Sequence, residues 1–254
     1  MFLDLNLNQQ KIHMKKYLIF LIFFIPYHYL IAQNLTPLQY FGDSYSEALA
    51  YCENHKEEIN SALKIFGVSS GEAISIVFPE IIRYNRFCDF AETTALEVAY
   101  VQGGKAIADF SIGRFQMKPS FVEFIEQELL SYKDLQNIFR DVIVYPPDIS
   151  NEYIRSERIE RLKQESWQLK YLACFIRLAE KRYSKELIQK PTERLLILSS
   201  AYNKGLNSSY EELKSISEKK TFPYGTKING RFSYYDVASY FNSHDAKQTL
   251  NPTP

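Results

Sequence analysis

Glu80 is the residue of this sequence best placed for acid–base chemistry. It lies on a helical stripe of mostly apolar residues at spacings of three and four. A carboxyl group held among apolar side chains resists ionisation, so its pKa rises toward the range in which it can exchange a proton near neutral pH. The pattern therefore predicts a general acid on a buried central helix. The stripe comprises Ala73, Ile76, Val77, Glu80 and Tyr84, and it is flanked by Ile74, Phe78, Ile81 and Ile82.

The neighbours of Glu80 leave a second interpretation open. An acidic residue on a helix can also bend out to solvent, or pair with a nearby cation such as Arg83. Ser69 with Glu72 predicts a capping-box start for this helix. Pro79 removes one helical hydrogen bond, so we expect the carboxyl group to lie near a bend.

Composition predicts a mainly α-helical protein with one substantial core. The chain has 254 residues, of which 46% are hydrophobic and 15% aromatic. Nine glycines and long stretches of helical periodicity favour helices over a β-sandwich or barrel. Thirty basic residues balance thirty acidic ones, so the charge gives no indication of a nucleic-acid partner.

The first 32 residues have the pattern of a secretory signal peptide. Lys15 and Lys16 precede an apolar run that ends near Ala32, and Met14 is an alternative start. Pro26 interrupts the run, which is short for a membrane-spanning helix. We therefore predict cleavage near Ala32 and a periplasmic or secreted mature protein without a stable membrane anchor.

The cysteine and histidine residues predict neither a disulfide framework nor a metal site. Cys52 and Cys88 could pair after export, leaving Cys174 alone, but three buried thiols are equally compatible with the sequence. His55 and His244 are far apart, and no spacing suggests a ligand pair on one face. We expect no metal and no organic cofactor.

Helical periodicity and turn-forming residues divide the rest of the chain into predicted segments. Residues 33–68 form an N-terminal helical extension with a helix from Ser44 to Gly67, and residues 131–165, broken by two prolines, form an inserted lobe or flap. Residues 243–254 lack periodicity, which predicts a flexible tail. Further helices are expected over 93–100 before Gly103, from Pro119, over 167–183, from Pro191 to a left-handed Gly205, after Ser209, and over 234–241.

Two short motifs accompany Glu80. The first, Gly113-Arg-Phe-Gln-Met-Lys-Pro119, combines a glycine that permits a tight turn with a proline suited to the first turn of a helix. The second, Ala201-Tyr-Asn-Lys-Gly205, forms the end of a helix. In this order, Glu80 and the two motifs resemble the soluble lytic transglycosylases of the lysozyme-like superfamily.

The resemblance implies a lysozyme-like fold over residues 69–242, with the 131–165 segment as an inserted helical lobe. Two departures mark a divergent member: Ile81 stands where the family has Ser, and Arg114-Phe115 replaces Leu-Met in the turn. The gaps on either side of Gln116 are also longer than usual, which implies insertions at 86–108 and 131–165.

The resemblance also implies a reaction. Glu80 would protonate the glycosidic oxygen between N-acetylmuramic acid (MurNAc) and N-acetylglucosamine (GlcNAc). It would then take a proton from the sugar's own 6-hydroxyl group, closing a 1,6-anhydro ring. The implied partner is a peptidoglycan glycan strand, bound by a monomer. Tyr202 would orient Glu80, Asn203 and Gln116 would bind acetamido groups, and Met117 and Phe115 would offer the sugar an apolar surface.

Each assignment has an alternative. Gln116 could cap the following helix, and Tyr202 and Asn203 could simply end theirs. Asp109 could direct a water molecule, as in a muramidase or chitinase-like hydrolase, although a loop aspartate is commonly a turn residue. Ile81 and the altered turn motif leave open a noncatalytic module that binds the cell wall.

Overall fold

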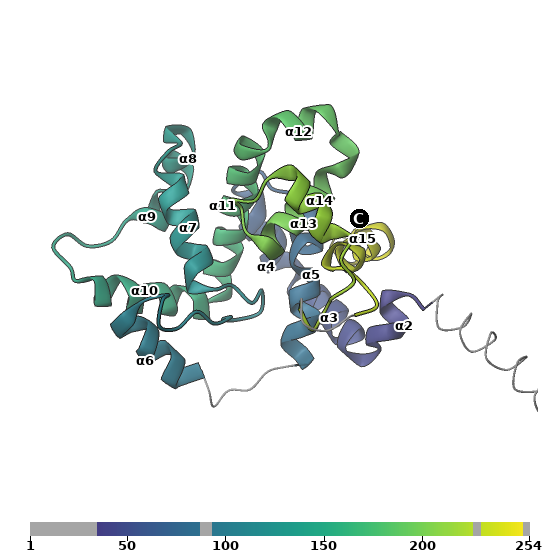
Figure 1. Cartoon of the computed structure of the whole chain (residues 1–254), viewed down its shortest axis with the longest axis horizontal. Coiled ribbons are helices and arrows are strands. Elements are labelled where there is room, and N and C mark those ends of the chain that lie inside the picture. The colour runs from purple at the N-terminus through teal and green to yellow at the C-terminus, as the bar shows by residue number, and fades with distance from the viewer. Residues whose placement is uncertain (1–34, 87–92, 226–229, 251–254) are drawn as a thin grey trace, which may run out of the picture. The chain divides into compact units, whose positions relative to one another are not determined.

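The computed structural model describes residues 35–86, 93–225 and 230–250, and these are mainly helical (Figure 1). The signal-peptide prediction for residues 1–32 lies outside this range. Residues up to Gly42 form one unit and residues from Asp43 a second, to which the candidate site belongs. The first unit contributes α2 (Pro37–Phe41). The second contains α3 (Asp43–Asn54), α4 (Lys56–Lys64), α5 (Ser70–Arg86), α6 (Thr93–Gly103), α7 (Pro119–Leu129), α8 (Lys133–Ile138), α9 (Arg140–Ile143), α10 (Asn151–Lys163), α11 (Glu165–Arg182), α12 (Ser184–Gln189), η1 (Pro191–Glu193), α13 (Arg194–Lys204), α14 (Tyr210–Ser217), α15 (Tyr234–His244) and α16 (Ala246–Leu250).

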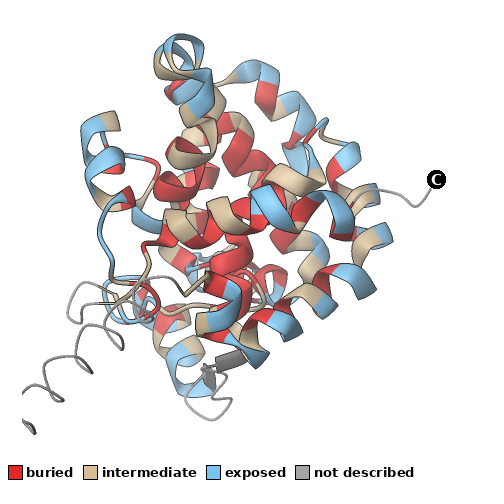
Figure 2. Ribbon diagram, turned by 90° about the vertical axis from the view of Figure 1, so that its right-hand side faces the viewer, coloured by how far each residue is buried: buried red, intermediate tan, exposed pale blue. Residues whose placement is uncertain are grey.

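The helix that carries Glu80 lies at the centre of the second unit. α5 packs against α3, α13, α15 and α16, and every residue from Ala73 to Ile82 is buried (Figures 1 and 2). This confirms the predicted buried central helix. Its predicted capping box forms only in part, because Ser69 accepts from the backbone of Glu72 while the Glu72 carboxylate binds Arg194.

Several predicted boundaries agree with the structure. α6, α7 and α11 cover the stretches expected to be helical, and Pro119 is the first residue of α7. Ser209 and Ser233 form complete capping boxes at the starts of α14 and α15. Local sequence signals were therefore sufficient to locate these helices.

Three local predictions were wrong. The helix expected from Ser44 to Gly67 is divided at His55, where ψ is 11°, outside the helical range. Gly205 ends α13 with φ 125° and ψ 140°, which is not the left-handed helical conformation. Part of the predicted flexible tail forms α16, whose buried residues Ala246, Thr249 and Leu250 belong to a helix that packs on α5. Tertiary burial stabilises this short helix although its sequence lacks a helical period.

The segment 131–165 is largely helical and is attached to its neighbours by a buried ion pair. α10 packs against α6, α7 and α11. Arg158 of α10 lies 2.7 Å from the Glu126 carboxylate of α7, which also accepts hydrogen bonds from the hydroxyl groups of Tyr145 and Tyr171. Several donors therefore satisfy a carboxylate that would be costly to bury alone.

Within the residues that the structure describes, no helix combines the length and the apolar character needed to cross a lipid bilayer.

Candidate functional site

Glu80 is buried and faces a small pocket. Its side chain is 7% exposed, and burial raises the pKa of the carboxyl group, whereas the charges of Arg83 and Lys118 act in the opposite direction. Arg83 Nη1 lies 3.1 Å from Oε2 and 3.4 Å from Oε1. Both sequence interpretations of Glu80 thus hold in part, because the acid is desolvated and also paired with Arg83.

Four further predicted residues come from distant segments to meet Glu80. Gln116 and Met117 lie in the loop before α7, and Tyr202 and Asn203 lie in the last turn of α13. Together with Glu80 they line a pocket of about 100 Å³. Its other lining residues are Arg83, Ser111, Lys118 and Phe121.

A tight turn forms one wall of this pocket. Ile112 and Met117 form an antiparallel bridge, with N–H···O distances of 2.9 and 3.1 Å. Gly113 has φ 68°, as the predicted turn requires, and Gln116 has φ 51°, which is uncommon for a residue with a side chain. The Gln116 amide donates to the Gly113 carbonyl at 2.9 Å. It therefore does not cap α7, which was the alternative to substrate contact.

Phe115 does not lie where the sequence predicted. Its side chain is fully buried and is not part of the pocket lining, so it offers no apolar surface to a ligand. Its backbone has a structural role instead. The Phe115 N–H donates to Gln168 Oε1 at 2.8 Å, and the Phe115 carbonyl accepts from the Tyr202 hydroxyl at 2.7 Å. The turn is therefore bound to both α11 and α13.

Tyr202 lies near Glu80, but its hydroxyl group does not bind the carboxylate. The hydroxyl donates to Phe115, and burial followed by the charge of Glu80 raises the pKa of Tyr202. Tyr234 of α15 is similar: its hydroxyl donates to the Ile76 carbonyl at 3.0 Å, and burial and Glu80 raise its pKa as well. Among the described residues, Arg83 is therefore the hydrogen-bond donor that orients Glu80.

The side chain of Asp109 binds the first turn of α7, and Asp109 does not line the pocket. Its carboxylate accepts from the Ser120 backbone at 3.0 Å and from the Ser120 hydroxyl at 2.8 Å. Lys118 Nζ lies 3.7 Å away. Asp109 is thus held by a residue eleven positions along the chain and is not the local turn residue that was the alternative, and Glu80 is left as the carboxylate among the described lining residues.

The thiols and potential metal ligands lie apart from this pocket. Cys52 and Cys174 are buried, and burial raises the pKa of each thiol. Cys88 lies outside the described residues, so its pairing stays a prediction. Among the residues with described positions, no group of three or more His, Cys, Asp or Glu residues could hold a metal ion.

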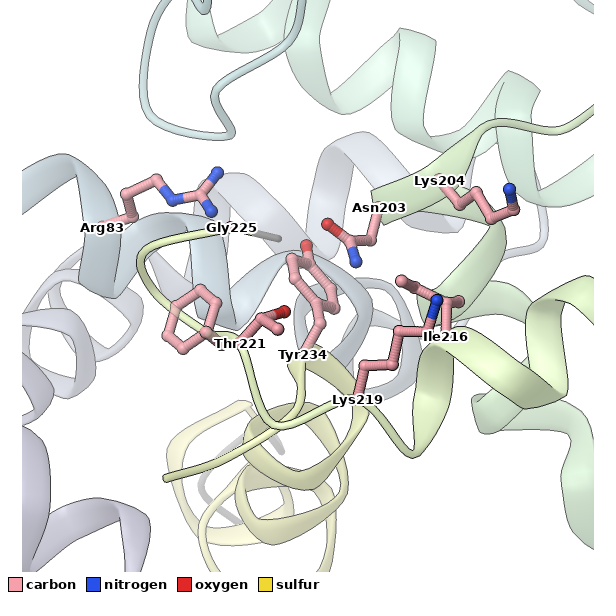
Figure 3. A pocket seen from close by; sticks show the side chains of 9 residues that line it. Arg83, Asn203, Lys204, Ile216, Lys219, Thr221, Gly225 and Tyr234 are labelled. Carbon is pink, nitrogen blue, oxygen red and sulfur yellow. The ribbon is translucent and has the colours of Figure 1, made fainter. Parts of the chain in front are cut away.

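A larger pocket of about 290 Å³ adjoins the first, and the two share Arg83 and Asn203. Figure 3 shows Arg83 on one side of the larger pocket, Asn203 and Lys219 on the other, and the Tyr234 ring between them. Thr221, Phe222 and Gly225 contribute from the loop that precedes α15. The Glu80 pocket and the larger pocket are therefore neighbouring parts of one surface.

No protein family, curated protein or solved structure matches this chain in comparisons of sequence and structure.

Sequence reasoning missed residues whose role depends on distant contacts. Gln168 is buried in α11, and nothing in the local sequence indicates that it binds the turn. Its amide nitrogen donates to the Leu162 carbonyl at 2.6 Å, so both ends of the side chain are engaged. Lys118 had a detectable signal, since it lies within the turn motif next to Gln116 and Met117.

We predict that Gly113→Ala destabilises the protein more than Gly225→Ala. Both glycines have positive φ, so each substitution costs about 1–2 kcal/mol of backbone strain. A Cβ atom at Gly113 would also collide with the Gln168 amide and lie 3.0 Å from the Leu162 carbonyl oxygen, whereas one at Gly225 meets no atom of the described residues within 4 Å. Denaturant unfolding should show an additional loss of roughly 1–3 kcal/mol for Gly113→Ala. Equal losses would mean that Gln168 moves aside freely.

We also predict that Glu80→Gln gains stability relative to the native protein as pH rises. The pKa of Glu80 is raised on folding, so native Glu80 favours the folded state at low pH and this contribution disappears between the ordinary and the raised pKa. The amide of the variant does not titrate. The difference in unfolding free energy should therefore increase with pH across that window and then become constant. Glu160→Gln, at an exposed position, controls for the lost charge. A difference that decreases with pH would show that Arg83 outweighs burial.

Proposed function

We propose that this protein is an exported lytic transglycosylase that cleaves the MurNAc–GlcNAc bond of peptidoglycan with Glu80 as its general acid and base. In this proposal the helices from α5 to α15 have a lysozyme-like arrangement. The enzyme acts as a monomer on the glycan strand, without a metal or an organic cofactor.

One observation carries the proposal: a single buried carboxyl group faces a pocket whose other walls come from both predicted motifs. Glu80 is 5% exposed, and two segments that follow it in the chain bring Gln116 and Asn203 to the same pocket. Perturbed acids in pockets are common at catalytic sites, although ion-pair networks also produce them. The ordered motifs favour the catalytic interpretation.

The proposed chemistry requires one carboxyl group that passes a proton in both directions. Protonated Glu80 donates to the leaving oxygen of GlcNAc as the bond to the anomeric carbon of MurNAc breaks. The resulting carboxylate then removes the proton of the 6-hydroxyl group of MurNAc, whose oxygen closes the 1,6-anhydro ring. The acetamido group of the sugar stabilises the positive charge that develops in between. Burial favours the first step because it keeps the acid protonated.

The Arg83 ion pair favours a second candidate, a noncatalytic module that binds the cell wall. A carboxylate held by a neighbouring arginine at 3.1 Å is also typical of a structural pair. A hydrolase has less support, because Asp109 is bound to Ser120 and does not line the pocket.

We predict that Glu80→Gln abolishes release of muropeptides from purified sacculi. Loss of general acid–base catalysis should lower the rate by about 10²–10⁴-fold. Mass spectrometry of the products should show 1,6-anhydro ends with the native protein. Glu57→Gln, at an exposed position of α4, is the matched control and should retain the native rate.

The other outcomes identify the alternatives. Undiminished lysis by Glu80→Gln would remove the catalytic role of Glu80. Reducing ends in place of anhydro ends would indicate a hydrolase. Absence of lysis by the native protein would favour the noncatalytic module.

We further predict that Arg83→Met moves the alkaline limit of activity to higher pH. Protonated Glu80 is the proposed active form, so kcat/KM falls as pH rises through its pKa. Arg83 lowers that pKa, and its removal therefore keeps Glu80 protonated at higher pH. Arg140→Met, at an exposed position, controls for the change in net charge. A shift toward lower pH would contradict the role assigned to Arg83.

A further inference from the structure

The larger pocket beside Glu80 has an unbalanced charge. Its basic lining residues are Arg83, Lys204 and Lys219, and no carboxylate belongs to its described lining. Lys204 turns away from Tyr234 in Figure 3, and its amine lies 3.4 Å from Glu212. Lys219 is exposed and forms no ion pair with a described residue. Arg83 and Lys219 thus present positive charge from opposite sides.

Arg83 retains hydrogen-bonding capacity toward this pocket. One terminal nitrogen donates to Glu80, and the other donates to the Pro223 carbonyl at 3.1 Å. A guanidinium group has five N–H donors, so these contacts leave donors for a further acceptor. Its side chain is 26% exposed, and its central carbon lies 5.5 Å from the centre of the Phe222 ring, which limits its movement.

We propose that this pocket binds a carboxylate of the glycan substrate between Arg83 and Lys219, next to the bond that Glu80 protonates. This inference rests on the proposed function and deepens it, because it requires an acidic glycan in place of a neutral one such as chitin. Asn203 and Thr221 line the same pocket and add polar groups around the ligand. Two groups of peptidoglycan offer this chemistry: the lactyl carboxylate of peptide-free MurNAc and the carboxylates of an attached peptide.

The shared position of Arg83 connects this binding to catalysis. A carboxylate bound in the larger pocket partly neutralises the guanidinium group that pairs with Glu80, and it adds a second negative charge nearby. Both effects favour the protonated form of Glu80. The charged groups near Glu80 are Arg83 on its own helix and Lys118 before α7. The titratable hydroxyl groups near it are those of Tyr202 and Tyr234. An acidic substrate thus raises the protonated fraction of Glu80, the group that cleaves it in the proposed reaction.

The test is direct binding, by isothermal titration calorimetry, of the disaccharide GlcNAc–MurNAc, its lactyl methyl ester and the same disaccharide carrying a dipeptide. These probes lack the MurNAc–GlcNAc bond and so are not cleaved in the proposed reaction. We expect the free acid or the dipeptide form to bind at least about tenfold more tightly than the ester. Whichever form binds tightly identifies the source of the carboxylate.

Variants locate the contact. Lys219→Gln should remove most of the preference for the acidic probe, and Lys219→Glu should reverse it. Lys214→Gln, on α14 but outside the pocket lining, should leave it unchanged and so controls for long-range charge. Equal binding of the acid, ester and dipeptide forms, or no binding of any, would overturn the inference. Muropeptide release from sacculi is measured separately: cleavage without acid preference contradicts the inference alone, and acid preference without cleavage contradicts the catalytic proposal alone.

Discussion

The candidate site depends on one constraint, the burial of a single carboxyl group on a helix that is apolar on nearly all sides. α5 is buried from Ala73 to Ile82, so Glu80 cannot turn toward bulk water without leaving the core. An ionised and unpaired carboxylate in such surroundings costs at least several kcal/mol. Arg83, one turn later, offsets part of this cost while its own charge stays partly hydrated. The remaining imbalance favours the proton, and this makes Glu80 suitable for proton transfer.

The turn that lines the same pocket satisfies a different constraint, because two of its residues, Gly113 and Gln116, adopt positive φ. Such a turn is stable only when its surroundings hold it. Gln168 and Tyr202 supply this support by binding the N–H and carbonyl groups of Phe115. The Tyr202 hydroxyl is therefore used to fix the wall, and the orientation of Glu80 falls to Arg83. Glu80 and the turn are therefore positioned by separate contacts, although both line the same pocket.

Local patterns in the sequence predicted what depends on neighbours along the chain, such as the buried α5 and the turn at Gly113. They failed where long-range packing decides. Phe115 is fully buried in the fold, and the sequence shows only that it is apolar. α16 is ordered by its burial against α5, which no helical period reports. The sequence gives no partner for the polar side chain of Gln168, and only the fold brings it to the turn that it binds.

The charge around the pockets bears on which reaction they can support. Breaking a glycosidic bond creates positive charge at the anomeric carbon, and Arg83 and Lys118 both lie near the acid that starts this step. A second protein carboxylate would normally stabilise that charge, but no further one belongs to the described lining of either pocket. In the proposed reaction this stabilisation comes from the substrate, through its acetamido oxygen and its own acidic groups. In the proposed reaction a hydroxyl group of the same sugar is the nucleophile, so no protein base is needed to activate water. Arg83 and Lys118 disfavour the positive charge that develops on a neutral sugar at this position. An acidic sugar carries negative charge that offsets this effect, so it is compatible with these cations.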